Sequence, residues 1–67
     1  MLYIEEMVRR LTELAFETND ENLLAIVDIF EAADEKWNET RTMINKVYAE
    51  NAYKALRKAY QTLVQGV

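Results

Sequence analysis

The chain has 67 residues, of which 51% are hydrophobic, and its 8 basic and 12 acidic residues give a formal net charge of −4. A chain of this length has room for one domain with a small core, and its apolar content excludes intrinsic disorder. The absence of cysteine and histidine excludes a disulfide framework and removes the commonest zinc ligands and the commonest general base.

A first helix is predicted over residues 2–17. Its apolar residues recur at spacings of three and four, which places them on one helical face. That stripe consists of Ile4, Met7, Val8, Leu11, Leu14 and Ala15. The polar segment that follows predicts a break, because either Thr18 or Asp20 can cap the next helix, and Thr18 with Glu21 fits a capping box.

A second helix is predicted over residues 20–37, and its broad apolar stripe indicates contact with more than one neighbour. The stripe comprises Leu23, Ile26, Val27, Phe30, Ala33 and Trp37, widened by Leu24 and Ile29. Asp28, Glu31 and Glu35 form an acidic ridge on the same helix, at spacings where like charges repel mildly. The ridge is either a solvated surface or a docking surface for a partner.

A third helix is predicted over residues 39–65. Neither glycine nor proline enforces a stop after Trp37, although Asn38 and Thr40 are suitable caps. A continuous helix from Asp20 to Gln65 would leave its apolar face uncovered in a monomer, and we therefore favour a break.

Two apolar stripes run along the third helix. The stripe expected to face the core comprises Ile44, Tyr48, Ala52, Ala55, Leu56, Ala59 and Leu63, and the second comprises Tyr53, Arg57, Tyr60 and Val64. A seam of small residues is formed by Ala49, Ala52, Ala55 and Ala59. The seam predicts close helix packing, either within the chain or with a second copy.

The predicted fold class is all-α: a three-helix domain over residues 1–67, or a helical hairpin with a long C-terminal helix, which we expect to form a homodimer. Residues 1–37 carry three basic and ten acidic residues, whereas residues 38–67 carry five basic and two acidic ones. The acidic half therefore either neutralises the basic half, within the fold or across a dimer, or guides docking onto a partner.

The residue types that most catalytic sites require are absent. The chain has no serine, and its only glycine, Gly66, cannot build a phosphate-binding loop. Carboxylates remain as possible Mg²⁺ ligands. The stretch Asn22–Asp34 resembles the second acidic helix of MazG-type nucleotide pyrophosphohydrolases, which implies a magnesium-dependent enzyme. Glu13 and Glu17 depart from the spacing of that family's first acidic pair, and Ala25 replaces an acid. We therefore expect no enzymatic activity and no cofactor.

A second alternative is that the chain binds nucleic acid. Cations of the third helix, with tyrosines between them, have the chemistry to meet phosphates and stack on bases. These residues are Lys46, Lys54, Arg57 and Lys58, with Tyr53 and Tyr60. The sequence pI of about 4.7 weighs against direct binding.

A local resemblance bears on the same alternative. Ala32-Ala33-Asp34, followed by Thr42-Met43, Asn45-Lys46 and Tyr48, resembles part of the Hha/YmoA family of small helical nucleoid modulators. The resemblance implies a helical dimer that acts through a larger DNA-binding partner. Glu35 and Lys36 replace that family's His-Arg pair, and the Pro and Trp of its C-terminal segment are missing.

The favoured hypothesis is a non-catalytic protein–protein interaction module that acts as a regulator, inhibitor or adaptor by occluding a partner surface. Tryptophan and tyrosine are common interface anchors. The predicted partner-binding residues are Asp28, Glu31, Glu35, Trp37, Tyr53, Arg57 and Tyr60. The longest apolar run, Leu23–Val27, is too short to span a membrane, and the acidic N-terminal segment lacks the basic residues of a signal peptide, so we expect a cytoplasmic protein.

Overall fold

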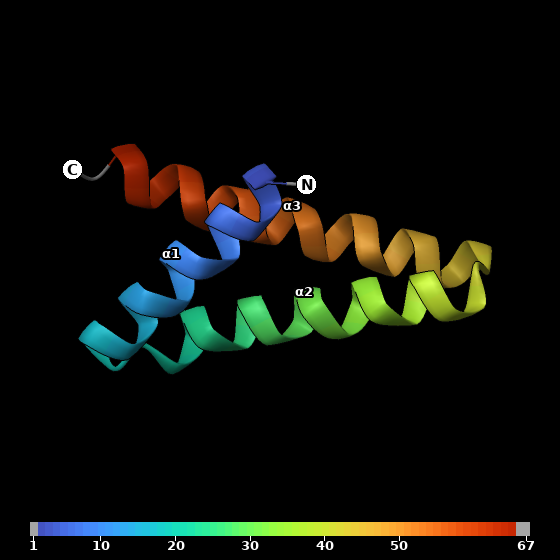
Figure 1. The fold of residues 1–67 in the computed structure, drawn as a ribbon, viewed down its shortest axis with the longest axis horizontal. Helices are drawn as coiled ribbons and strands as arrows, with labels where there is room; N and C mark the ends of the chain where they lie inside the picture. The colour runs from blue at the N-terminus through green and yellow to red at the C-terminus, as the bar shows by residue number, and fades with distance from the viewer. Residues whose placement is uncertain (1, 66–67) are drawn as a thin grey trace.

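The computed structural model describes residues 2–65, and over this range it consists of three helices. They are α1 (Leu2–Thr18), α2 (Glu21–Thr40) and α3 (Met43–Gln65). Figure 1 shows α2 and α3 side by side in opposite directions, with α1 crossing obliquely over the half of this pair nearest the α1–α2 turn. The predicted all-α, three-helix architecture is confirmed. No helix in the described range is long and apolar enough to cross a membrane.

The turn between α1 and α2 is set by Asn19 and Asp20. Asn19 has a left-handed φ of 54°, a conformation that asparagine tolerates better than most residues. Asp20 is the N-cap of α2, and its carboxylate accepts a hydrogen bond from the Leu23 amide at 3.0 Å. Of the two predicted caps, Asp20 is therefore the one in use. The Thr18 hydroxyl instead donates to a carbonyl of its own helix at 2.8 Å.

The break between α2 and α3 exists, but it lies later than the predicted end at Trp37. The helix continues to Thr40, and Arg41 then adopts a left-handed φ of 54° with its amide donating to the Trp37 carbonyl at 2.9 Å. The side-chain amide of Asn45 donates to the Thr40 hydroxyl at 2.6 Å, which links the two helices across the turn. The predicted start of the third helix at residue 39 is therefore wrong, because residues 39 and 40 complete α2.

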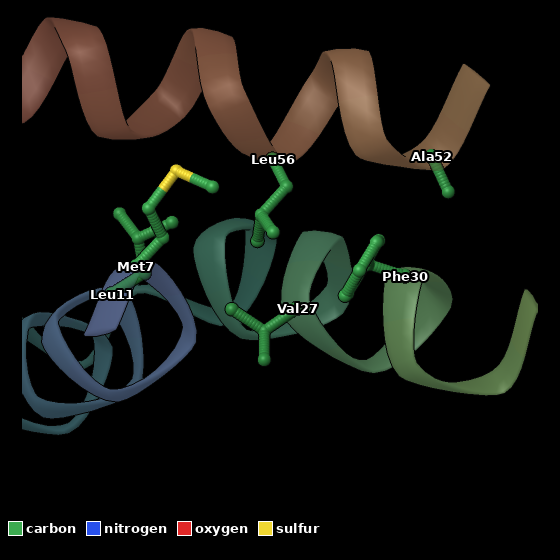
Figure 2. Close-up of a cluster of buried hydrophobic side chains, with 6 residues drawn as sticks. All are labelled: Met7, Leu11, Val27, Phe30, Ala52 and Leu56. Atoms are coloured by element: carbon green, nitrogen blue, oxygen red, sulfur yellow. The ribbon is translucent and has the colours of Figure 1, made fainter. Parts of the chain in front are cut away.

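The core lies where all three helices meet. Each helix contributes two of its central residues (Figure 2): Met7, Leu11, Val27, Phe30, Ala52 and Leu56. Full burial of a side chain the size of leucine or methionine stabilises the fold by about 1.5–3 kcal/mol. The predicted stripes of α1 and α2 are confirmed as buried or half-buried, except that the flanking Ile29 is 58% exposed.

The predicted core stripe of α3 is wrong in its first half. Ile44 is 70% exposed and Tyr48 is 66% exposed, and Ala55 is exposed as well. The core-facing residues of α3 come from both predicted stripes, with Ala49 added from the alanine seam: Ala49, Ala52, Tyr53, Leu56, Ala59, Tyr60 and Leu63. Because Ala49 and Ala52 are buried within the chain, their part of the alanine seam serves internal packing.

Candidate functional site

A groove of about 600 Å³ lies where α2 and α3 extend past the start of α1, and we call it the aromatic groove. Phe30 and Ala49 lie in it, and both are buried residues. Trp37 and Tyr53 are half-buried, so both rings remain accessible, and Tyr53 also packs against the core. The full lining is Ile4, Phe30, Asp34, Trp37, Lys46, Ala49, Glu50, Tyr53, Lys54 and Arg57.

Helical spacing brings these residues to the two walls of the groove. Phe30 and Trp37 are seven residues apart on α2, and Lys46, Tyr53 and Arg57 follow spacings of seven and four on α3. The rings of Phe30 and Tyr53 are 6.2 Å apart between centroids and inclined by 50°, which is a favourable aromatic arrangement. The structure therefore brings three of the predicted partner-binding residues, Trp37, Tyr53 and Arg57, into one groove.

Trp37 is also held by a residue outside the groove. The guanidinium carbon of Arg41 lies 5.0 Å from the centroid of the Trp37 ring, within the range of a cation–π contact. The indole is thus positioned by the residue that follows α2. Such a positioned aromatic side chain loses less conformational entropy on binding than a free one.

The acidic ridge lies partly in a second groove. Glu31 and Glu35 line a second groove of about 600 Å³ between α1 and α2, where Asp34 and Glu39 join them. We call this the acidic groove. Asp28 does not line it, although all three ridge residues are exposed.

The opposite charges of α2 and α3 are not paired with each other. Within residues 2–65, the ion pairs join Glu6 to Arg9 at 3.9 Å and to Arg10 at 3.5 Å, all within α1. The acids of α2 and the cations of α3 therefore do not neutralise one another by direct ion pairs inside the described chain. Their charges face solvent or another molecule.

Tyr60, also predicted as a contact residue, packs against the core and lines neither groove. Conversely, Asp34 and Glu50 lie in the aromatic groove but were not predicted there. Helical spacing is the signal that could have identified them. Asp34 lies four residues after Phe30 and Glu50 lies four residues after Lys46, and both of these residues also line the groove.

The aromatic groove combines an apolar and aromatic lining with charged residues. In the described part of the chain, no three acidic side chains lie close enough together to hold a metal ion. An apolar centre with aromatic anchors and a charged rim is the typical anatomy of a protein interface. No protein-family model, curated protein or solved structure matches this chain. Function must therefore be inferred from the chemistry of these surfaces.

Proposed function

We propose that this chain is a non-catalytic protein–protein interaction module, homodimeric, that acts as a regulator, inhibitor or adaptor by occluding a partner surface. The observation that carries the proposal is the aromatic groove. It places half-buried Trp37 and Tyr53 beside Arg57, and these three residue types are enriched at interface hot spots.

The lining of the groove defines the chemistry of the partner. Phe30 and Ala49 supply an apolar surface, and the cations Lys46, Lys54 and Arg57 of the α3 wall outnumber the acids Asp34 and Glu50 of the lining. A helical segment with a large apolar anchor and acidic neighbours matches both features. A segment that is bound in the groove cannot bind another protein at the same time. In this way a small module inhibits or competes with the other interactions of its partner.

The acidic groove supports the same function through electrostatic steering. Glu31 and Glu35 are exposed and unpaired in the described chain, so they attract basic residues elsewhere on a partner. Changing Asp28, Glu31 and Glu35 to lysine is expected to lower partner association without unfolding, because none of them is buried.

The proposal is tested by selecting a displayed library of helical segments on the wild-type protein. Selected segments are expected to bind the wild type and to lose binding to Trp37→Ala and Arg57→Glu. Phe16→Ala is the matched control, because Phe16 is 68% exposed on α1 and outside the groove. Equal binding to all three variants, or a library that yields no binder, would overturn the proposal.

One observation favours a second candidate function. The aromatic groove places three cations beside Trp37 and Tyr53, a combination that also suits single-stranded nucleic acid. A salt titration with single-stranded DNA separates the candidates, because phosphate contacts give affinity a steep dependence on salt. Protein-segment binding without DNA binding supports the proposed function.

A further inference from the structure

The α2–α3 pair has an apolar face that does not contribute to the core. Two stripes of exposed residues with helical spacing form it, one on each helix, and we call it the outer face. The residues are Ala25, Ile29 and Ala32 on α2 with Ile44, Tyr48 and Ala55 on α3. Ile29, Ile44 and Tyr48 are 58%, 70% and 66% exposed, which is a large apolar surface for a chain of this size.

The two stripes belong to one surface. A shallow groove of about 340 Å³ between the helices is lined by Ile29, Ala32 and Tyr48, together with half-buried Ala33 and Asn45 and exposed Lys36. No residue of α1 lines this groove. The outer face is therefore bounded by α2 and α3 alone, and α1 leaves it uncovered.

Opposite charges flank this face. On a helical projection, Asp28 and Glu35 lie about 100° and 120° from Ile29, on the side of α2 turned away from α3. Lys54 and Lys58 lie about 120° and 80° from Tyr48, on the corresponding outer side of α3. These four side chains are exposed and form no ion pair within residues 2–65.

We infer that a second copy of this chain covers the outer face, in a two-fold dimer whose axis runs along the α2–α3 pair. This axis places α2 of one copy on α3 of the other. The side of α2 that carries Asp28 and Glu35 then meets the side of α3 that carries Lys54 and Lys58. The alternative two-fold, α2 on α2, would set acid against acid, which is repulsive. The complementary charges therefore favour a second copy of the chain as the occupant, in the orientation that packs α2 on α3. In such a two-fold dimer, the same surface of both copies forms the interface.

The register of the helices brings specific charges together. Counting equal numbers of residues from the α2–α3 turn places Asp28 level with Ala55. Asp28 then lies within one helical turn of Lys54 and Lys58 of the partner subunit. The dimer thus pairs acidic side chains of α2 with basic side chains of α3, and neither group forms such ion pairs within residues 2–65 of one chain.

The size of the face is compatible with a stable dimer. At 1.5 Å per residue, the 20 residues of α2 span about 30 Å, and two adjacent helices are about 20 Å wide. If the whole side of the α2–α3 pair that carries the outer face is covered, on the order of 600 Å² per subunit is buried, at the low end of the range of specific interfaces. The inference deepens the homodimeric part of the proposed function and rests on it. The apolar residues of the outer face lie outside the aromatic groove, and the two surfaces share only Lys54.

The test is solution mass by light scattering across concentration, on the wild type and matched variants. The wild type is expected to reach twice 7.9 kDa, and Tyr48→Glu to remain near 7.9 kDa with an unchanged helical circular dichroism spectrum. Phe16→Glu, a control of similar exposure on α1, is expected to dimerise like the wild type.

A charge exchange provides the second, independent test. Asp28→Lys alone, or Lys58→Glu alone, is expected to weaken the dimer about tenfold or more, and the two changes together to restore it; neither residue lines the aromatic groove. A wild type that stays near 7.9 kDa at all concentrations, or a dimer insensitive to Tyr48→Glu and to the charge changes, would overturn the inference. Segment binding in the aromatic groove is read out separately, so either idea can fail alone.

Discussion

The guanidinium of Arg41 stacks over the ring of Trp37 at 5.0 Å, and the amide of the same arginine donates to the Trp37 carbonyl at 2.9 Å. The residue that ends α2 thus also positions the largest aromatic side chain of the aromatic groove. Two contacts between the same pair of residues link the helix end to the candidate binding surface.

Substitution of Arg41 separates its two roles. Arg41→Ala removes the cation–π contact but keeps a side chain at a left-handed residue, so the free energy of unfolding is expected to fall by about 0.5–1 kcal/mol. Arg41→Gly loses the same contact but relieves about 1 kcal/mol of backbone strain, so its stability should lie near that of the wild type. Urea denaturation of both variants checks this order, and equal destabilisation by alanine and glycine would contradict it.

The N-cap of α2 gives a second prediction. Asp20→Ala removes the acceptor of the Leu23 amide and is expected to lower stability by about 1 kcal/mol, whereas Asp20→Asn keeps an acceptor and most of the stability. Thr18→Ala serves as the control, since Thr18 does not cap α2. Thermal denaturation measures all three, and a larger loss from Thr18→Ala would restore the capping box predicted from sequence.

The core gives a third prediction. Leu56 is fully buried among residues of all three helices, so Leu56→Ala is expected to cost about 2–5 kcal/mol through lost burial and a cavity. That loss approaches the whole stability of a small domain, and the variant should be largely unfolded by circular dichroism. Val64→Ala, at a residue 55% exposed on the same helix, should change stability by less than about 0.5 kcal/mol. Similar losses at the two positions would mean that α3 packs in a different orientation.

Dimerisation through the outer face predicts how thermal stability responds to protein concentration. Association stabilises the folded state by mass action, so the Tm of the wild type should rise with concentration. Ile29→Glu places a charge in the centre of the outer face and should make the Tm independent of concentration. A Tm that rises equally in the variant would place the dimer contact on another surface.

The sequence was sufficient to predict the packing of α1 and α2, because apolar residues occupy one arc of α1 and a broad continuous arc of α2. It was insufficient for α3, where Ile44 and Tyr48 on one side compete with Tyr53 and Tyr60 on the other. Only contact with the other two helices decides which side is buried. The end of α2 was missed because a left-handed arginine leaves no glycine or asparagine signal.

The candidate site was predictable in residue type but not in arrangement. Trp37, Tyr53 and Arg57 were chosen for their chemistry, and their common groove follows from the orientation of α3 that the sequence left open. The same orientation moved Tyr60 into core packing. The outer face was not recognised in the sequence, because Ile44, Tyr48 and Ala55 had been assigned to the core stripe of the third helix and Ile29 to the widened stripe of the second.

The central claim, that the aromatic groove binds a protein segment, is tested most directly through Trp37, the only tryptophan of the chain. Its fluorescence emission is to be titrated with a segment selected from the displayed library, on the wild type and on Arg57→Glu. We predict a saturable change in Trp37 emission for the wild type and its loss in Arg57→Glu, while Phe16→Ala behaves like the wild type. A segment that binds with unchanged Trp37 emission, or equally to Arg57→Glu, would contradict the account.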